Sequence, residues 1–134
     1  MPMTRGFPET LTAQALFDKI ATHLFAQRRR SLAYINGRDK CAYRDADGER
    51  CCAVGVVIPD DRYSPEIEGK SPFNEVFMKH FPDLDGFKVL LSSLQGVHDN
   101  CDLHGDGTFV LNDLRFRLGS VAAGHNLSAA AIPA

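Results

Sequence analysis

Three cysteines, and one histidine that is followed by an aspartate, are the residues of this sequence whose types could do chemistry together. Cys41, Cys51 and Cys52 lie in one short stretch, and His98 precedes Asp99 later in the chain. A cysteine becomes a nucleophile when a nearby histidine takes its proton, and an acidic neighbour can orient that histidine. Cys41, Cys51, His98 and Asp99 are therefore candidate catalytic residues of a cysteine-dependent hydrolase or transferase. No family-specific cysteine-hydrolase pattern accompanies them, so a non-catalytic protein is the favoured interpretation.

The same residue types could instead bind zinc, which prefers thiolate and imidazole ligands in a tetrahedral arrangement. The candidate ligands are Cys41, Cys51, Cys52, His98, Cys101 and His104. The chain lacks the Cys-x2-Cys pair that is typical of structural zinc sites. We therefore expect no cofactor, with a structural zinc-binding module as the alternative. Buried unliganded thiols and a cross-strand disulfide also fit these cysteines.

A calcium-binding loop is a further alternative. Asp102-x-His104-x-Asp106-Gly107, with Asp113 at the twelfth position, is similar to the spacing of an EF-hand loop. Histidine is a poor ligand for a hard cation, and the side chain of Asp113 is shorter than the glutamate that normally closes such a loop. A polar connection between two helices explains the same residues.

A β-hairpin over residues 41–52 is the element predicted to position the cysteines, because two short β-prone runs flank an Asp/Gly turn. In this hairpin Cys41 faces Cys52 if the loop closes on two residues, or Cys51 if the loop contains a bulge. The apolar run 53–58 follows and is ended by a proline. We expect a short buried helix there, although its periodicity also allows a buried strand.

Apolar residues that recur at spacings of three and four predict the helices. The helices are expected from Thr10 or Thr12 to Gln27, from Ser71 to Phe81, from Asp83 through Val97, and from Phe109 to Ala123. With 134 residues, the chain is long enough for one domain. The expected fold is α+β, a mostly helical single domain with about four helices packed around one β-hairpin. Residues 1–9 are expected to form a flexible arm, residues 10–127 the globular domain and residues 128–134 a flexible tail.

Positive charge is concentrated in residues 28–50. This segment has seven Lys or Arg and four Asp or Glu residues, whereas the whole chain has a net charge of −2. The overall charge argues against nucleic-acid binding over the whole surface, but a local patch can bind phosphates or an acidic protein surface. A solvated helix end followed by a charged hairpin explains the same pattern. The residues of this candidate binding surface are Arg28, Arg29, Arg30, Tyr34, Arg38, Arg44 and Arg50.

Two segments carry a resemblance to other proteins. Residues 41–69 combine Cys-Ala-Tyr-Arg, a short Asp/Gly turn, Cys-Ala-Val-Gly, Ile-Pro-Asp and Glu-x-Glu-Gly, and residues 91–99 read Leu-Ser-Ser-Leu-Gln-Gly-Val-His-Asp. These segments resemble a group of small uncharacterised phage and prophage proteins, and the similarity covers residues 13–100. The resemblance implies a phage-type accessory protein and supplies no established activity.

The expected function is non-catalytic binding of a host macromolecule, such as a defence component. A host protein is the first expected partner, and nucleic acid bound through the local basic patch is the second. The N-terminal residues lack the apolar core of a signal peptide, and no apolar run is long enough to cross a bilayer. We therefore expect a cytoplasmic protein with no membrane partner. The sequence leaves the oligomeric state open.

Overall fold

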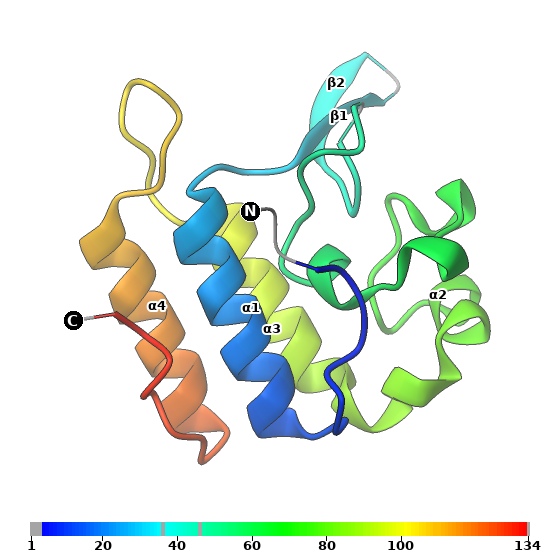
Figure 1. The fold of residues 1–134 in the computed structure, drawn as a ribbon. Helices are drawn as coiled ribbons and strands as arrows, with labels where there is room; N and C mark the ends of the chain where they lie inside the picture. The colour runs from blue at the N-terminus through cyan, green and yellow to red at the C-terminus, as the bar shows by residue number, and fades with distance from the viewer. Residues whose placement is uncertain (1–3, 36, 46, 134) are drawn as a thin grey trace.

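The computed structural model describes residues 4–35, 37–45 and 47–133. In these ranges the chain forms four α-helices and one two-stranded antiparallel ribbon (Figure 1). The helices are α1 (Ala13–Gln27), α2 (Glu75–His80), α3 (Lys88–Asn100) and α4 (Leu111–Gly124), and the strands are β1 (Leu32–Ile35) and β2 (Arg38–Cys41). The prediction of a mostly helical fold with about four helices is confirmed. Among the described residues, no helix has both the length and the apolar character that crossing a membrane requires.

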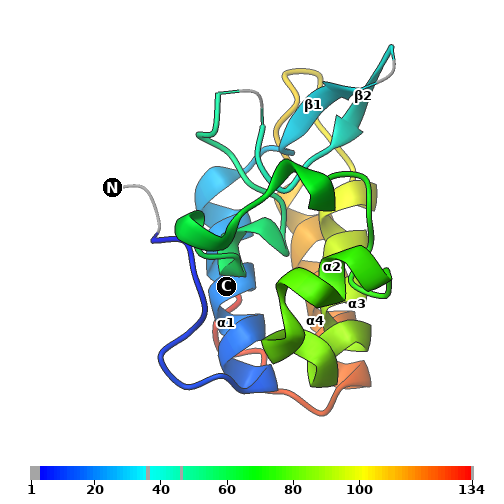
Figure 2. The same cartoon turned by 90° about the vertical axis from the view of Figure 1, so that its right-hand side faces the viewer.

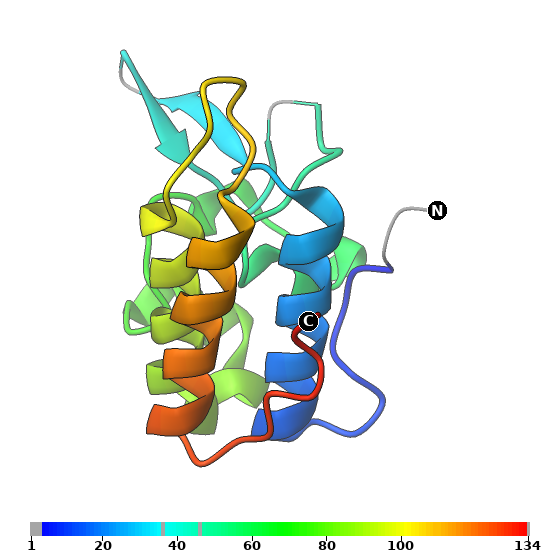
Figure 3. The same cartoon turned by 90° about the vertical axis from the view of Figure 1, so that its left-hand side faces the viewer.

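The long helices α1, α3 and α4 lie side by side and bury facing apolar stripes (Figure 3). α1 begins as predicted, because the Thr12 hydroxyl accepts a hydrogen bond from the backbone N–H of Ala15, with 3.1 Å between the two atoms. It ends at Gln27, and Arg28 then adopts a left-handed φ of 62°. The fully buried residues of the three helices include Leu16, Phe17, Ile20, Leu24, Leu91, Leu94, Leu114 and Leu118.

The ribbon lies at residues 32–41, so the predicted hairpin over residues 41–52 is wrong. Its register pairs Leu32 with Cys41 and closes on a two-residue connection. Gly37, in that connection, has a φ of 82°, which a tight hairpin turn requires and which glycine adopts without strain. Cys41 therefore pairs with a leucine rather than with another cysteine. All four cysteines of the chain carry free thiols.

The described residues between 42 and 50 form a loop, because the side chain of Asp45 pairs with backbone N–H groups that a second strand would otherwise use. Its Oδ1 atom accepts the backbone N–H groups of Glu49, at 2.9 Å, and Arg50, at 3.1 Å. The helices also do not surround the ribbon, which projects from one end of the molecule (Figures 1 and 2). The element at the centre of the packing is the apolar run that follows this loop.

Residues 51–58 form that central run, and every one of them is buried. Gly55–Val57 make one 3₁₀ turn that packs against α1, so the expected short buried helix is confirmed in this form. Residues 55–87 continue around the side of α1 and α3 that faces away from α4 (Figure 2). A Cβ atom at Gly55 would lie 2.3 Å from the carbonyl oxygen of Tyr43, which explains the glycine at this position.

Arg44 is a structural residue, and its prediction as part of a binding surface is wrong. Its side chain is buried, and it donates to the carbonyl oxygens of Gly55, at 2.6 Å, and Ile58, at 2.7 Å. Gly55 opens the 3₁₀ turn and its carbonyl also accepts the N–H of Ile58, at 3.2 Å, whereas Ile58 follows the turn. The guanidinium also contacts the carboxylate of Asp60 at 3.1 Å, which compensates its buried charge.

Glu68 holds the same loop from the opposite side. Its carboxylate accepts the backbone N–H groups of Tyr43, at 2.9 Å, and Arg44, at 3.1 Å, and the hydroxyl of Tyr63, at 2.7 Å. A carboxylate that accepts several hydrogen bonds can pair two backbone N–H groups that would otherwise need the carbonyls of a neighbouring strand. The backbone N–H groups of Tyr43 and Arg44 are therefore paired by a side chain, whereas that of Ala42 still donates to the carbonyl of Ser31, at 2.8 Å.

Helices α2, α3 and α4 begin later than the sequence predicts. The hydroxyl of Ser71 accepts from the N–H of Phe73, and α2 begins after Asn74, whose side chain accepts from Val76 at 2.9 Å. Pro82–Phe87 form a 3₁₀ segment, and α3 follows it at Lys88. Phe109 precedes α4 rather than opening it. These shifts change no packing face.

Both ends of the described chain contact the body. The backbone N–H of Gly6 donates to Val56 at 2.9 Å, and the Lys19 ammonium donates to the Gly6 carbonyl at 2.6 Å. At the other end, the Gln14 amide exchanges two hydrogen bonds with the backbone of Ser128, at 2.8 and 3.0 Å. The arm and the tail are therefore seated on α1 in this structure.

Replacing Gly55 by alanine will destabilise the protein by about 3 kcal/mol, because the new Cβ atom overlaps the Tyr43 carbonyl and the chain must shift. Gly119 is the matched control. It lies within α4, and a Cβ atom there would have no atom within 4 Å. Gly119→Ala will stabilise the protein by roughly 0.5 to 1 kcal/mol through helix propensity. Urea unfolding of the two variants measures both effects, and equal stabilities would contradict the close packing at Gly55.

Candidate functional site

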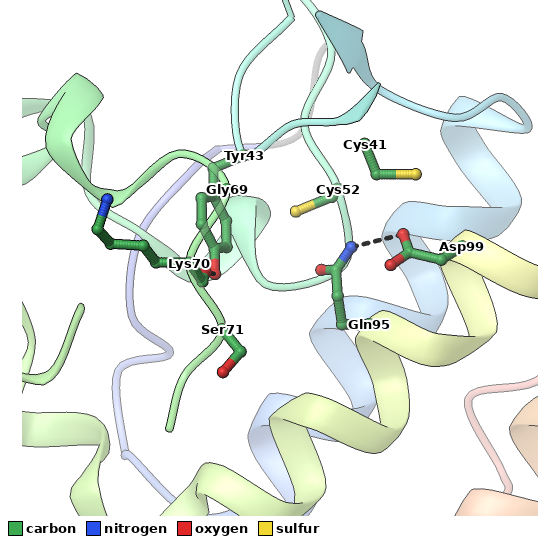
Figure 4. Close-up of a pocket in the computed structure, with 8 residues that line it drawn as sticks. All are labelled: Cys41, Tyr43, Cys52, Gly69, Lys70, Ser71, Gln95 and Asp99. Carbon is green, nitrogen blue, oxygen red and sulfur yellow. Dashed lines mark hydrogen bonds between the residues drawn. The ribbon is translucent and has the colours of Figure 1, made fainter. Parts of the chain in front are cut away.

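A pocket of about 370 Å³ brings together several residues of the sequence-predicted site. It lies between the end of β2, the segment 69–71 and α3 (Figure 4). Its lining residues are Cys41, Tyr43, Cys52, Gly69, Lys70, Ser71, Gln95 and Asp99. His98 is fully buried directly behind Asp99. The candidate catalytic residues Cys41, His98 and Asp99 are thus close together, as the sequence predicts for a working site.

Both ring nitrogens of His98 are engaged by the chain. The backbone N–H of Ser31 donates to Nε2 at 3.0 Å, so Nε2 carries the lone pair. The proton is therefore on Nδ1, which donates to the Asp99 carboxylate at 2.8 Å. This is the neutral tautomer with each nitrogen in a hydrogen bond. No lone pair of the ring is directed at a thiol.

The thiol of Cys41 lies near the carboxylate of Asp99, and His98 offers it no free nitrogen to act as a base. The sulfur of Cys41 lies within 4.8 Å of the Asp99 carboxylate. Burial and this carboxylate together raise the pKa of the Cys41 thiol to about 12, because both disfavour the thiolate. A catalytic cysteine needs the opposite shift, toward a thiolate at neutral pH. The arrangement therefore does not activate Cys41 as a nucleophile.

Asp99 is the ionised member of the group. Burial raises the pKa of Asp99, whereas His98, Cys41 and Gln95 lower it. The pKa of this carboxyl group is therefore below its ordinary value. The Gln95 amide donates to Asp99 at 2.9 Å. The side-chain oxygen of Gln95 accepts the N–H of Val54 at 3.2 Å, which joins the pocket to the central run. Asp99 is therefore held as a carboxylate whose position is fixed by hydrogen bonds from His98 and Gln95.

A metal ion would need ligand atoms that His98 does not offer. Within residues 4–35, 37–45 and 47–133, one group of three potential ligands lies close together, and its atoms from Cys41, His98 and Asp99 are within 4.8 Å of one another. If Nδ1 of His98 bound a metal, the ring proton would move to Nε2 and would face the N–H of Ser31. Two donors would then oppose each other in a buried place, so the donor set does not fit zinc.

The remaining predicted zinc ligands do not join this group. Figure 4 shows the sulfur of Cys52 directed away from that of Cys41. Cys52 accepts the N–H of Gly55 at 3.3 Å, and the thiol of Cys101 is directed at the carbonyls of its own loop. His104 is exposed on the same loop. Burial raises the pKa values of Cys52 and Cys101, as expected of structural thiols.

A second thiol–imidazole pair, Cys51 with His23, was missed by sequence reasoning. Nε2 of His23 donates to the Cys51 carbonyl at 2.8 Å and lies 3.6 Å from its sulfur. His23 follows Ile20 by three residues on the apolar face of α1, and this spacing is the signal that could have revealed its burial. Burial lowers the pKa of His23 to about 4, because the charged ring would lose its hydration.

Gln27, one turn further along α1, completes the contacts to Cys51. Its side-chain amide accepts the Cys51 N–H at 3.1 Å and donates to the Cys51 carbonyl at 2.9 Å. The backbone of Cys51 is therefore fully paired by α1 side chains. Burial also raises the pKa of the Cys51 thiol, so this cysteine is not an activated nucleophile either.

The arginines that follow α1 serve mainly to hold the loop between α3 and α4. Arg29 donates to the Asp106 carbonyl at 2.7 Å, and Arg30 donates to the Cys101 carbonyl at 3.0 Å. Arg28 and Arg50 are exposed. The side chains of the predicted surface residues Tyr34 and Arg38 lie outside the described part of the structure. We call the described residues of 28–50 (28–35, 37–45 and 47–50) and residues 101–109 together the loop end, because they lie at one end of the molecule (Figures 1 and 3).

The carboxylates of the predicted calcium loop bond to the chain and do not converge. Oδ2 of Asp113 accepts the N–H of Asp102 and the side chain of Arg117, both at 2.8 Å. Oδ1 of Asp106 accepts the N–H and the hydroxyl of Thr108, at 3.0 and 2.6 Å. The described residues of this loop form a self-closed connection between helices, which is the simpler of the two sequence interpretations.

Cys41 will react slowly with iodoacetamide, at least ~100-fold more slowly than free cysteine at pH 8, because its thiolate is disfavoured. Asp99→Asn will speed this reaction, since it removes the charge that opposes the thiolate. Asp47→Asn, an exposed carboxylate outside the pocket, is the matched control and will leave the rate unchanged. Mass spectrometry of the labelled cysteine gives each rate. A rate that titrates near neutral pH and depends on His98 would establish the cysteine enzyme instead.

His23 will make the protein less stable in acid. Its pKa is about 4 in the folded state and near 6.5 when unfolded, so the unfolded chain binds more protons between these values. Stability is therefore complete above pH 6.5 and falls as the pH drops toward 4, by about 3 kcal/mol. Urea unfolding of wild type and His23→Gln at each pH isolates this contribution. Parallel pH profiles for the two proteins would contradict it.

Comparison with known proteins adds no functional assignment. No protein-family model, no curated protein and no solved structure matches this chain. The resemblance to small phage and prophage proteins stays a prediction from the sequence. The function is therefore argued from the geometry of the pocket and of the loop end.

Proposed function

We propose that this chain is a non-catalytic binding protein that contacts a host protein through its loop end. The engaged nitrogens of His98 and the raised thiol pKa values support a role without catalysis. The resemblance to phage and prophage proteins supports a partner from the host cytoplasm, such as a defence component. The loop end supports this proposal through the hydrogen bonds that hold its loops and through the side chains that it exposes.

The loop end is fixed before any partner arrives, and this is the observation that carries the proposal. Besides the hydrogen bonds from Arg29 and Arg30, the N–H of Phe109 donates to the Arg28 carbonyl at 2.8 Å. Arg29 and Thr108 also form an antiparallel bridge. A surface that is ordered in the free protein loses less conformational entropy on binding, so more of its contact energy becomes affinity.

The exposed side chains of the loop end suit a protein partner. Leu32 and Leu103 are 41% and 39% exposed, so both offer apolar surface to a partner. The loop end also includes Arg28 and Arg50, which are exposed. Apolar residues with neighbouring arginines are typical of protein–protein interfaces.

A phosphate backbone is a poorer fit to the same surface. Arg44 is buried, and Arg29 and Arg30 donate to carbonyl oxygens, so fewer cations are available than the sequence count indicates. Exposed carboxylates also lie among the remaining arginines; they include Asp47, Glu49, Asp102 and Asp106. Nucleic-acid binding depends on continuous positive potential, which this mixture lowers.

Leu103→Asp will reduce capture of a specific protein from a nuclease-treated host lysate about ten-fold, because the substitution places an unpaired charge in the contact. Leu32→Ser will have the same effect. Both positions are exposed, so thermal unfolding of the variants will match that of wild type. The captured protein is identified by mass spectrometry and its affinity is then measured with purified partner.

Val89→Ser is the matched control, since Val89 is exposed at the first turn of α3, away from the loop end. This variant will capture the partner as wild type does. Equal capture by Leu103→Asp and wild type would show that the loop end is not the contact surface. If capture fails in the nuclease-treated lysate, and an untreated lysate yields nucleic acid alone, the protein partner is replaced by the second partner class.

A further inference from the structure

The pocket beside α3 contains one ionised group that the chain leaves partly open. The side chain of Asp99 is 37% exposed, and this exposed part lies on the pocket wall. Figure 4 shows the carboxylate on one side of the pocket and the ring of Tyr43 on the other, with Gln95 and Cys52 between them. The proposed function makes no use of this arrangement.

The other walls of the pocket do not neutralise Asp99. Burial raises the pKa values of the Cys41 and Cys52 thiols, so both stay uncharged at neutral pH. Lys70 lines the pocket with its stem, but Figure 4 shows its ammonium pointing away from Asp99. Arg30 is close enough to lower the pKa of Cys41, yet its guanidinium donates to the Cys101 carbonyl.

The hydrogen bonds of Asp99 define what can still bind to it. A carboxylate has about four acceptor positions, and the side chains of His98 and Gln95 donate to this one, while the thiol of Cys41 lies nearby. Oδ1 alone accepts both His98 and Gln95. A guanidinium fork needs a free position on both oxygens, so it does not fit, whereas an ammonium can bind through one.

We propose that this pocket binds a primary ammonium group, which donates to the Asp99 carboxylate while its alkyl chain lies against Tyr43 and Cys52. The aromatic ring at the opposite wall gives the alkyl chain an apolar surface. A pocket of about 370 Å³ is in the size range of small-molecule sites. The ammonium can belong to a free alkylamine or to a lysine side chain of another polypeptide.

The test uses butylammonium chloride and its neutral isostere butanol, titrated into the ¹⁵N-labelled protein at constant ionic strength. Butylammonium will shift the backbone amide signals of residues 69–71 and 95–99, and butanol will bind at least ~10-fold more weakly, as expected for a hydrogen bond to a charged group. Equal binding of the two compounds, or shifts confined to other regions, would overturn the proposal. This comparison needs no variant, so it holds even if a substitution impairs folding.

Asp99→Asn will weaken butylammonium binding about ten-fold, since it removes the charge and keeps the shape. Asp61→Asn, an exposed carboxylate outside the pocket, is the matched control and will bind as wild type does. A capped lysine peptide separates the two sources: comparable shifts assign the pocket to a lysine side chain, and their absence assigns it to a free amine. Failure of all these titrations leaves the loop-end surface untouched, because that surface is tested by Leu103→Asp.

Discussion

One buried hydrogen bond, from the backbone N–H of Ser31 to Nε2 of His98, determines the chemistry of this molecule. Both residues are fully buried, so an unpaired N–H there would cost roughly 1 to 3 kcal/mol. The bond joins the chain that enters β1 to the end of α3. Because it fixes the lone pair on Nε2, it also directs the Nδ1 proton at Asp99. The carboxylate also lies beside the thiol of Cys41, and the pocket keeps one fixed negative charge.

The helical part of the fold could be read from the sequence, because apolar spacing and capping residues act locally. Thr12 caps α1 and Gln27 ends it, as predicted. The hairpin was misplaced, although Asn36-Gly37 between two short β-prone runs is a strong hairpin signal. The Asp/Gly turn at residues 45–48 competed with that signal. Long-range contacts decide between them, since Arg44 and Glu68 hold the adjoining backbone in place of a second strand.

The sequence predicted which residues of the candidate site lie together, but not the role of each residue. Cys41, His98 and Asp99 do lie close together, with their sulfur, nitrogen and oxygen atoms within 4.8 Å of one another. Residue types cannot tell which nitrogen of a histidine faces a backbone donor, and that direction separates a general base from a structural residue. The charge count over residues 28–50 failed for a similar reason. It treats all arginines alike, whereas Arg29, Arg30 and Arg44 are directed at carbonyl oxygens inside the molecule.

The pairing of Gln27 with Cys51 has a consequence for how copies of this chain meet one another. A backbone N–H and C=O that lie open side by side form an edge to which a strand from another molecule can add, and such edges lead to swapped or aggregated assemblies. The Gln27 amide satisfies both groups of Cys51 from within α1. A single helical side chain thus closes the backbone beside the central run, and this position does not offer a template for intermolecular β-sheet growth.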